Sequence, residues 1–425
     1  MNISKLHQIF LDSTGISTDT RSLNKNNLFF ALSGSQFNGN KFAKQALDKG
    51  ATKAIIDDKD FENENTILVD DCLEALQALA HYHRNYLKLK IIAITGSNGK
   101  TTTKELTTAV LQKKYRVAAT KGNLNNHIGV PLTLLSMTKE TEIGIVEMGA
   151  NHQGEIRDLC KIAEPNFGYI TNFGKAHLEG FGGIEGVIKG KSELYNYLIS
   201  NEGTIFINTD DKIQVEKCNS YQNTISFGEM KEANYTISNH SHNHTASISH
   251  DNKIICSQLT GKYNSANMAA ATAIGLYFKV EFNSIKEAIE NYVSSNNRSQ
   301  VIETDHNTII LDAYNANPTS MALSIENLND LPSKQKTIIL GDMFEVGPTS
   351  GKEHQHIVNL LENLDFHLAI VCGENFYKTH TDKVISFKEF SDMKLYLSKQ
   401  SLENNTILIK GSRGMQLERL LELWT

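Results

Sequence analysis

Short apolar runs of strand length alternate along the chain with longer stretches in which apolar residues recur at helical spacing. The first part contains an apolar run at 28–34, a helix-like stretch that Gly50 closes, and a second apolar run at 53–57. Residues 72–87 follow, with apolar side chains at the spacing of a helix. Strand, helix and strand in this order predict a small α/β unit and a helix that leaves it.

A second block begins at 91–95, IIAIT, a continuous apolar run typical of a strand that is covered on both faces. A glycine-rich turn and a helix over 101–114 are predicted to follow it. Further strands are predicted at 116–119, 143–148, 167–171 and 204–208. We expect a doubly wound parallel sheet here, with a β-rich appendage near 224–260 and a helix at 264–278 that returns to the core.

The last block repeats the alternation, with strands predicted at 308–314, 336–343, 367–373 and 405–412. Their carboxyl ends carry Asp312, Asp342, Gly373 and Lys410–Gly411. Because ligands of open α/β sheets bind beyond the carboxyl ends of the strands, we expect a second sheet edge that faces a ligand. The chain is therefore expected to form three domains, at residues 1–85, 86–297 and 298–425.

Composition and charge narrow the function classes. Of the 425 residues, 40% are hydrophobic and 21% are charged, as in a folded globular protein. The net charge is −6 and no segment forms a basic arm or stripe, so nucleic-acid binding is not expected. No run approaches the ~18 apolar residues of a membrane span, and the first residues do not resemble an export signal. The five cysteines lack metal-binding spacing, which favours a reducing compartment, the cytoplasm.

The strongest chemical signal is TGSNGKTT at 95–102, between the apolar run and the predicted helix. Glycines in such a loop let backbone N–H groups turn toward phosphate oxygens, and the helix N-terminus adds partial positive charge. Lys100 can reach the β- and γ-phosphates, and a threonine hydroxyl can ligate Mg²⁺. Ile94 stands where the usual pattern has its first glycine, so the loop is a shortened variant. The alternative is a glycine-rich turn that binds no nucleotide.

Three further residues are candidates for a metal site. Glu147 ends a predicted strand near the phosphate loop, where a carboxylate can hold the metal, although it could be an ordinary strand-end carboxylate. His177 lies in a glycine-flanked loop after another strand, and Lys191 is predicted at a helix start among small residues. Taken alone, such a histidine is more often structural and such a lysine more often faces solvent. The histidine-rich run at 239–244 is interpreted as a solvated hairpin, because no carboxylate or cysteine accompanies it.

Taken together and in this order, these residues resemble the Mur ligase family over nearly the whole chain. The resemblance implies that Lys191 is carbamylated; Tyr263 and Ala313 depart from the family, which often has histidine and serine there. It implies an ATP site formed by Gly96, Ser97, Asn98, Gly99, Lys100, Thr101, Thr102, Asn264, Asn267, Arg298 and Asp312. It also implies the catalytic residues Lys100, Glu147, His177 and Lys191, and the Mg²⁺ ligands Thr101, Glu147, His177 and Lys191.

Within the family, the stretches at 147–156, 311–321 and 340–347 resemble the member that adds D-alanyl-D-alanine, and the DNPR-type signature of a related member is absent. Residues 17–34 and 37–42 resemble a domain that binds a uridine-diphosphate sugar, and 122–131 resemble a substrate loop. The substrate-binding residues implied in this way are Thr18, Asp19, Arg21, Asn123, Asn125, Asn126, Asn315, Asn317, Ser412 and Arg413.

The fold implied by the resemblance is α/β in three domains: a small N-terminal α/β substrate domain, a central P-loop domain with a doubly wound sheet, and a C-terminal Rossmann-like α/β domain. The implied activity joins D-alanyl-D-alanine to UDP-N-acetylmuramoyl tripeptide through an acyl phosphate, with ATP and Mg²⁺, in a cytoplasmic step of peptidoglycan synthesis. No membrane insertion is expected, and the protein is expected to be a monomer. The alternatives are a folylpolyglutamate synthetase-like or tripeptide-forming ligase and, from another class, a nucleotide-dependent switch.

Overall fold

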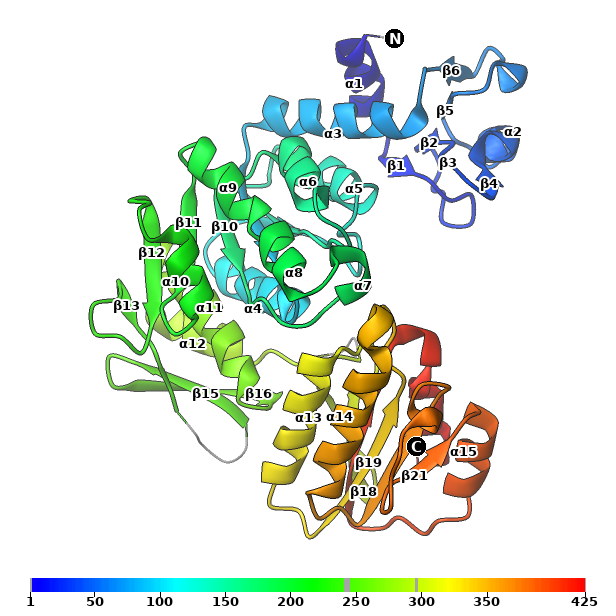
Figure 1. Ribbon diagram of the computed structural model, residues 1–425. Coiled ribbons are helices and arrows are strands. Elements are labelled where there is room, and N and C mark those ends of the chain that lie inside the picture. The colour runs from blue at the N-terminus through cyan, green and yellow to red at the C-terminus, as the bar shows by residue number, and fades with distance from the viewer. Residues whose placement is uncertain (1, 241–244, 295–296, 425) are drawn as a thin grey trace.

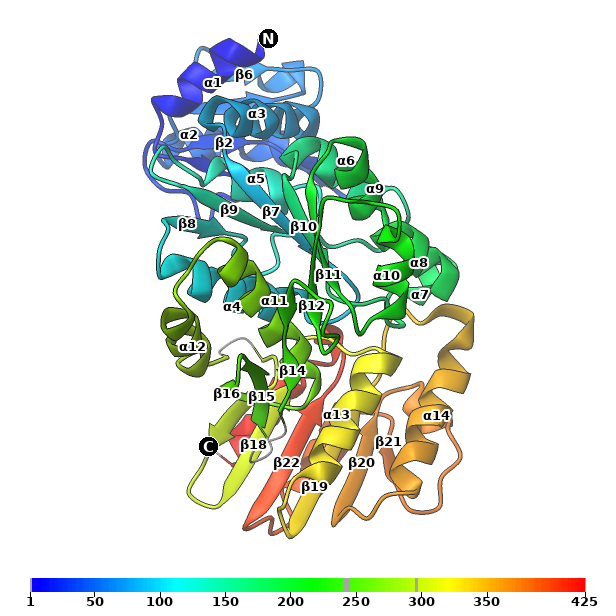
Figure 2. The same ribbon diagram turned by 90° about the vertical axis from the view of Figure 1, so that its left-hand side faces the viewer.

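The computed structural model describes residues 2–240, 245–294 and 297–424. Three α/β parts follow one another along the molecule, with the N-terminal part at one end and the C-terminal part at the other (Figures 1 and 2). The three large sheets take their strands from separate stretches of sequence, at 16–68, 90–236 and 300–410. No helix among the described residues combines the length and the apolar character that a membrane crossing requires.

The N-terminal part is built on four parallel strands in the order β1-β2-β5-β6. Its strands are β1 (Ile16–Ser17), β2 (Leu28–Phe30), β3 (Ser33–Gly34), β4 (Phe37–Asn38), β5 (Lys53–Ile56) and β6 (Thr66–Leu68). Its helices are α1 (Ile3–Leu11), α2 (Ala43–Asp48) and α3 (Cys72–Leu87). The long helix α3 has the bounds expected from its apolar spacing. Asp71 caps its start, since its side chain accepts a hydrogen bond from the Glu74 backbone N–H.

Helix α3 also joins the N-terminal part to the central part, packing against α5 and α6 (Figure 1). On it, His83 Nε2 lies 2.9 Å from the Met137 carbonyl oxygen and His83 Nδ1 lies 3.0 Å from His7 Nε2. Arg84, on the same helix, donates hydrogen bonds to the carbonyl oxygens of Ala163 and Glu164. Buried polar contacts therefore fix this junction as well as apolar packing.

The central part has a fully parallel sheet of seven strands in the order β13-β12-β11-β10-β7-β9-β8. Its strands are β7 (Lys90–Thr95), β8 (Val117–Ala119), β9 (Ile143–Glu147), β10 (Phe167–Ile170), β11 (Thr204–Asn208), β12 (Thr224–Gly228) and β13 (Tyr235–Thr236). Its helices are α4 (Lys100–Gln112), α5 (Gly129–Leu135), α6 (Glu155–Ala163), α7 (Leu178–Phe181), α8 (Ile184–Lys191), α9 (Glu193–Ser200), α10 (Lys212–Cys218), α11 (Tyr263–Tyr277) and α12 (Phe282–Glu290).

Side chains of β7 pack alternately on the two faces of this sheet. Ile91 and Ala93 belong to the core shared with α3, α5, α6 and α9, whereas Ile92 and Ile94 belong to the core shared with α4, α11 and α12. Residues 91–94 of this strand are all apolar and buried, and helices cover both faces of the sheet, as the continuous run predicted.

The predicted appendage near 224–260 is smaller than expected. β12 and β13 extend the central sheet in parallel, and only β14 (Ser238–Asn239), β15 (Thr245–His250) and β16 (Lys253–Thr260) form a separate antiparallel sheet. Apolar spacing alone does not distinguish an added parallel strand from an antiparallel hairpin, because the choice depends on which edge the chain reaches.

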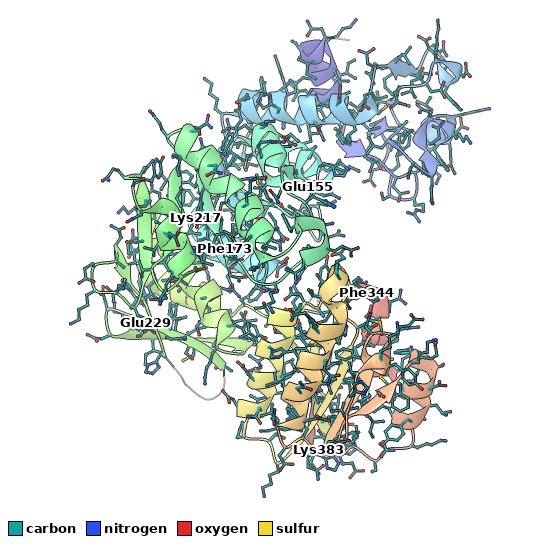
Figure 3. All side chains as sticks on the ribbon, viewed as in Figure 1. Glu155, Phe173, Lys217, Glu229, Phe344 and Lys383 are labelled. Carbon is teal, nitrogen blue, oxygen red and sulfur yellow. The ribbon has the colours of Figure 1, made fainter. Side chains whose placement is uncertain are left out.

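The C-terminal part has a six-stranded sheet in the order β17-β18-β22-β19-β20-β21, parallel except for β17. Its strands are β17 (Gln300–Glu303), β18 (Asn307–Asp312), β19 (Gln335–Gly341), β20 (Leu368–Cys372), β21 (Ile385–Phe387) and β22 (Asn405–Lys410). Its helices are α13 (Pro318–Asp330), α14 (Ser350–Glu362) and α15 (Phe390–Leu397). Figure 3 places Phe344, just after β19, at the end of this part that faces the central part.

Candidate functional site

A cavity of about 1370 Å³ lies between the central and C-terminal parts. Its central wall contains the phosphate loop, the carboxyl ends of β9 and β10 and the start of α11. Its C-terminal wall contains the carboxyl ends of β18 and β22 and the start of α13. The ends of parallel strands from two sheets thus face one space, which is where α/β proteins bind ligands.

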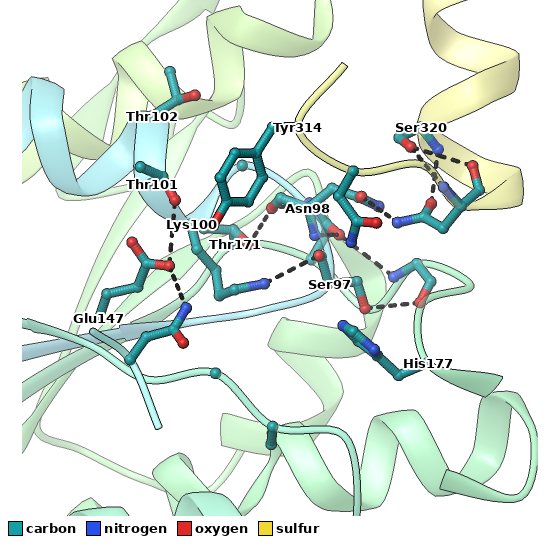
Figure 4. Close-up of a pocket in the computed structure, with 18 of the residues that line it drawn as sticks. Ser97, Asn98, Lys100, Thr101, Thr102, Glu147, Thr171, His177, Tyr314 and Ser320 are labelled. Atoms are coloured by element: carbon teal, nitrogen blue, oxygen red, sulfur yellow. Dashed lines mark hydrogen bonds between the residues drawn. The ribbon is translucent and has the colours of Figure 1, made fainter. Parts of the chain in front are cut away.

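The phosphate loop is held in shape by β10 and by α11. Gly99 has a left-handed φ of 80°, and a Cβ atom there would lie 2.5 Å from Asn267 Oδ1. Ser97 Oγ donates a hydrogen bond to the Gly174 carbonyl over 2.7 Å, and Thr171 Oγ1 donates to the Asn98 carbonyl over 2.5 Å. The loop is therefore preorganised by its neighbours, with glycine where no side chain fits (Figure 4).

Lys100 points back over its own loop. Its Nζ donates hydrogen bonds to the carbonyl oxygens of Gly96, over 2.8 Å, and Ser97, over 3.2 Å. Burial lowers the pKa of Lys100 to about 8, against the attraction of Glu147 and helped by repulsion from Arg298. An anion bound in the cavity would favour the charged ammonium, so this lysine suits a phosphate ligand.

Glu147 ends β9 with its carboxylate almost completely buried, at 1% exposure. Its Oε1 accepts hydrogen bonds from Thr101 Oγ1 over 3.2 Å and from Asn125 Nδ2 over 2.8 Å (Figure 4). Its Oε2 has no hydrogen-bond partner, and the Lys104 ammonium lies 3.6 Å away. A buried carboxylate whose second oxygen accepts no hydrogen bond, close to a threonine hydroxyl, fits Mg²⁺, which prefers hard oxygen ligands.

Protein side chains alone do not complete such a site. Among the described residues, no group of three or more histidine, cysteine, aspartate or glutamate side chains is arranged to hold a metal ion. Mg²⁺ in nucleotide sites usually takes one or two protein ligands and completes its shell with phosphate oxygens and water. The pair Thr101 and Glu147 meets that requirement.

Lys191 lies at the end of helix α8, not at a helix start as predicted from the sequence. Ser192 caps both α8 and the following α9, so the small residues around Lys191 mark a junction between two helices. The side chain is fully buried, donates a hydrogen bond to the Ala150 carbonyl over 3.0 Å and lies 5.0 Å from the Phe181 ring centroid. Burial holds the pKa of Lys191 well below its usual value, with repulsion from Lys100 acting in the same direction.

His177 lines the cavity from the loop between β10 and α7. Its backbone is left-handed, with φ 51°, and its ring is directed toward the phosphate loop near Ser97 (Figure 4). Its Nδ1 contacts a carboxylate oxygen of Glu345, from the segment after β19. Lys191 does not line the cavity but lies behind Ala150, which does.

On the α11 side, two asparagines form a buried chain of hydrogen bonds. Asn264 Nδ2 donates to the Thr260 carbonyl over 2.7 Å, and Asn267 Nδ2 donates to Asn264 Oδ1 over 2.9 Å. Thr103 Oγ1 donates to Asn267 Oδ1 over 3.0 Å. Tyr263, the departure noted above, has its hydroxyl oxygen 2.9 Å from Ser299 Oγ. Both asparagines line the cavity, and Asn267 ties α11 to the phosphate-loop helix.

The opposite wall comes from the C-terminal part. The Arg298 guanidinium carbon lies 3.7 Å from the centroid of the Tyr314 ring. Asp312 Oδ2 accepts hydrogen bonds from Lys410 Nζ over 2.5 Å and from Ser324 Oγ over 3.2 Å. Sequence reasoning missed Tyr314, which lies two residues after Asp312 and lines the cavity. It placed Lys410 at the sheet edge expected to face a ligand, without assigning it a role, and Lys410 lines the cavity from the end of β22.

Four predicted substrate residues lie on this wall. Asn317 caps α13 and donates from Nδ2 to Asn98 Oδ1 over 2.7 Å, across the cavity (Figure 4). Asn315 lies beside it, and Ser412 accepts a hydrogen bond from the Phe344 backbone N–H over 2.8 Å. Arg413 pairs with Glu418 over 2.9 Å and keeps 59% of its side chain exposed. All four line the cavity.

The N-terminal residues predicted to bind substrate lie elsewhere. Thr18, Asp19 and Arg21 are absent from the cavity lining, and Arg21 pairs with Asp19 over 2.7 Å at the surface. Hydrogen bonds from Arg21 lower the pKa of Asp19 to about 2. By contrast, the substrate-loop residues Asn123, Asn125 and Asn126 do line the cavity, beside the phosphate loop.

Fewer strand ends of the C-terminal sheet face the cavity than predicted: Asp312 and Lys410 line it, whereas Asp342 and Gly373 do not. Asp342 accepts hydrogen bonds from the backbone N–H groups of Asn375 and Phe376, both over 2.9 Å, and Gly373 packs against its carboxylate. It therefore caps the turn after β20 and does not face the cavity. Of the histidine-rich run, residues 241–244 lie outside the described residues.

Family models match three stretches of the chain. They are described as "Mur ligase family, catalytic domain" at residues 12–84, "Mur ligase middle domain" at 94–275, and "Mur ligase, glutamate ligase domain" at 297–413.

Characterised relatives match the chain end to end. A Bacillus subtilis protein named UDP-N-acetylmuramoyl-tripeptide--D-alanyl-D-alanine ligase is 34% identical over 96% of this chain and 92% of its own length. The Escherichia coli protein of that name is 31% identical over the same shares.

Solved structures match in the same way. MurF from Acinetobacter baumannii has a TM-score of 0.86 and 29% identity, covering 98% of this chain and 97% of its own. MurF ligase from Thermotoga maritima, solved in complex with ADP, has a TM-score of 0.85 and 27% identity over the same shares. With relatives more than 30% identical over nearly its whole length, and with a cavity lined by the residues that carried the resemblance, the chain belongs to the Mur ligase family.

Proposed function

We propose that this chain is an ATP-dependent ligase that joins D-alanyl-D-alanine to UDP-N-acetylmuramoyl tripeptide and releases ADP and phosphate. The names of its relatives support this assignment. The single structural observation that supports it most is the cavity in which the phosphate loop and Glu147 face Arg298 and Asp312 across two parts of the chain.

The chemistry explains why a ligase needs such a cavity. A peptide carboxylate is a poor electrophile, since oxide would be its leaving group. Transfer of the γ-phosphoryl group of ATP to a carboxylate oxygen releases ADP and forms an acyl phosphate. The free amine of D-alanyl-D-alanine then attacks the carbonyl carbon, and phosphate leaves with the former carboxylate oxygen as the amide bond forms. Walls from two parts exclude water, which would otherwise hydrolyse the acyl phosphate.

The residues of the phosphate loop are placed to hold the triphosphate. The N–H groups at the start of α4 and the Lys100 ammonium would neutralise negative charge that gathers on the γ-phosphoryl group. Mg²⁺ held by Thr101 and Glu147 would supply further charge neutralisation and orient the phosphates. Asn264, Asn267, Arg298 and Asp312 would bind the nucleoside side, because they line the same cavity from α11 and the C-terminal part.

We assign His177 and Lys191 to a second Mg²⁺ near the acceptor carboxylate. A carbamate on Lys191 would replace a positive charge with a negative one and offer oxygen ligands. The modification requires a neutral amine, and the burial that lowers the pKa of Lys191 favours that form. The carbonyl of Ala150 now accepts its hydrogen bond, so the carbamate would need a modest repacking there.

Substrate binding extends along the cavity and beyond it. Asn123, Asn125 and Asn126 are proposed to contact the acceptor peptide, because they lie beside Glu147. Thr18, Asp19 and Arg21 are proposed to bind the uridine-diphosphate end, on the N-terminal part. The dipeptide would bind at Asn315, Asn317, Ser412 and Arg413.

The proposed function also implies where the protein acts and in which assembly state. We place the protein in the cytoplasm, as a monomer with domains at 1–85, 86–297 and 298–425. The five cysteines, all among the described residues, are free thiols, which supports a reducing compartment.

A coupled phosphate-release assay tests the function. The full chain, ATP and Mg²⁺ are mixed with UDP-N-acetylmuramoyl tripeptide, with D-alanyl-D-alanine, or with both, and the product mass is measured. Release that requires both substrates, with a product heavier by one dipeptide minus water, is expected. Phosphate release that is independent of both substrates would indicate a nucleotide switch. Phosphate release when glutamate or a single amino acid takes the place of D-alanyl-D-alanine would indicate another amide ligase.

A further inference from the structure

Two residues with left-handed backbones meet between the central and C-terminal parts. His177 has φ 51° and Glu345 has φ 61°, conformations that residues with side chains rarely adopt. The Nδ1 atom of His177 contacts Oε2 of Glu345, and both side chains line the cavity. These backbone conformations turn the two side chains toward one another between the central and C-terminal parts.

Neighbouring contacts hold the loop that carries His177 on the C-terminal part. The Glu179 backbone N–H donates to the Glu345 carbonyl over 3.3 Å, and the Lys175 backbone N–H donates to Thr319 Oγ1 over 3.0 Å. Lys175 Nζ also pairs with Glu353 over 2.7 Å. The loop that carries His177 is therefore docked on the C-terminal part at several points, of which only the Glu345 side chain reaches the histidine ring.

The hydrogen-bond chemistry of this contact determines which ring nitrogen is free. An ionised carboxylate only accepts hydrogen bonds, so the His177 Nδ1 must carry the proton that it shares with Glu345. In a neutral imidazole, Nε2 then keeps its lone pair. Carboxylates that accept from one ring nitrogen commonly orient the other nitrogen toward a metal.

We propose that Glu345 is a positioning residue: it orients the His177 ring, with Nε2 presented to the cavity, and does so only when the C-terminal part is docked on the central part. The proposal rests on the proposed function, since it concerns the same reaction. Glu345 comes from the C-terminal part and His177 from the central part, so closure of the cavity and orientation of the ring are one event. Nucleotide bound between the parts would thereby prepare the acceptor side of the site.

Steady-state kinetics of the full chain with ATP, Mg²⁺ and both substrates test this role. Glu345→Ala is expected to lower kcat by about 10- to 100-fold, the usual cost of losing a residue that orients a metal ligand, with KM for ATP changed less than threefold. Glu345→Gln is expected to recover most of the rate, because its amide oxygen still accepts from Nδ1–H. Glu353→Ala is the matched control, as it removes a neighbouring cross-part contact outside the cavity, and is expected to retain near-normal kcat.

A measurement without turnover provides the second readout. ¹⁵N chemical shifts of histidine-labelled protein bound to ADP report which ring nitrogen is protonated, and the His177→Gln spectrum identifies the His177 signals. The Nδ1–H form is expected in the wild-type protein and a mixture with the Nε2–H form in Glu345→Ala. The proposal would be overturned if the wild-type protein carried Nε2–H at His177, or if Glu345→Ala and Glu353→Ala lowered kcat equally. Absence of ligase activity in the wild-type chain would instead contradict the proposed function. The tautomer measurement would still test the role of Glu345, because it does not depend on turnover.

Discussion

Two lysines of this protein show how one residue type acquires different chemistry from its surroundings. Lys100 keeps part of its surface open to the cavity, and burial lowers its pKa only to about 8. Lys191 is fully enclosed behind Ala150, and its pKa lies well below the usual value. Lys100 therefore remains largely charged at neutral pH for phosphate binding. Burial shifts Lys191 toward the neutral amine that carbamate formation requires.

Replacing Lys100 tests the phosphate loop. Lys100→Ala is expected to lower kcat by ~10²-fold or more, because a preorganised donor to the developing phosphoryl charge is lost. Phosphate release with both substrates measures the effect. Lys113→Ala, which removes a lysine just beyond the far end of the same helix, is the control and should leave kcat unchanged. Near-normal turnover of Lys100→Ala would contradict a catalytic role of the phosphate loop.

Replacing Lys191 tests the carbamate. Lys191→Ala is expected to lose most activity and to regain part of it in millimolar short carboxylates, which can enter the space left and supply the missing oxygen ligands. Rates with and without acetate or formate measure the rescue. Lys189→Ala, an exposed lysine two residues earlier in α8, should show neither loss nor rescue. Full activity of Lys191→Ala without added carboxylate would contradict the carbamate.

At the scale of elements, helix α3 carries a buried histidine pair at the junction of two parts. Because His83 Nε2–H donates to the Met137 carbonyl, its Nδ1 accepts, and His7 Nε2–H must donate to it. Protonating His83 would place two N–H groups face to face. Burial lowers the pKa of both histidines, and for His7 the neighbouring His83 adds to the effect.

This arrangement predicts a loss of stability in mild acid. A histidine whose pKa is lowered on folding binds its proton in the unfolded state first, so stability falls as pH drops below the unfolded value of 6.5. The slope reaches at most about 1.4 kcal/mol per pH unit for each histidine. Thermal unfolding at pH 7.5 and 5.5 should show a larger decrease in wild-type protein than in His7→Gln. The exposed His356→Gln should behave like wild type, and equal decreases in all three would contradict the prediction.

At the scale of the whole molecule, the candidate site exists only because the parts meet. The phosphate loop and Glu147 belong to one sheet, whereas Asp312 and Lys410 end strands of another. Asn317 spans the gap with a hydrogen bond of 2.7 Å to Asn98. A nucleotide held on both sides would stabilise this docked arrangement by mass action.

Removing that hydrogen bond should weaken nucleotide binding. Asn317→Ala is expected to lower affinity for an ATP analogue with Mg²⁺ by about 2- to 12-fold, the equivalent of one hydrogen bond of 0.5–1.5 kcal/mol. Titration calorimetry measures the affinity, and the melting temperature without nucleotide reports the separate loss of the α13 cap. Ser320→Ala disturbs the same cap without touching Asn98 and should bind nucleotide normally. Unchanged affinity in Asn317→Ala would contradict this role.

Much of the architecture follows from local pattern, and the family assignment made from the motifs is confirmed by the relatives. The run at 91–95, the helix at 72–87 and the loop at 95–102 appear where the sequence predicts them, because apolar spacing, caps and glycines act over a few residues. Lys191 was misplaced within its helix, because Ser192 serves two helices at once and no local signal marks such a junction.

The amino-acid sequence by itself determined which chemical groups this protein carries and, Lys191 excepted, which strand or helix end bears those that form the site. Only the tertiary structure decided which of these ends share a cavity. In it Asp342 caps a turn, Tyr314 and Glu345 line the site, and Arg21 lies on a separate surface. The physical reason is the separation along the chain over which each effect acts. Periodicity and capping act between near neighbours in the chain, whereas burial, pKa and partners at the site depend on side chains that meet across hundreds of residues.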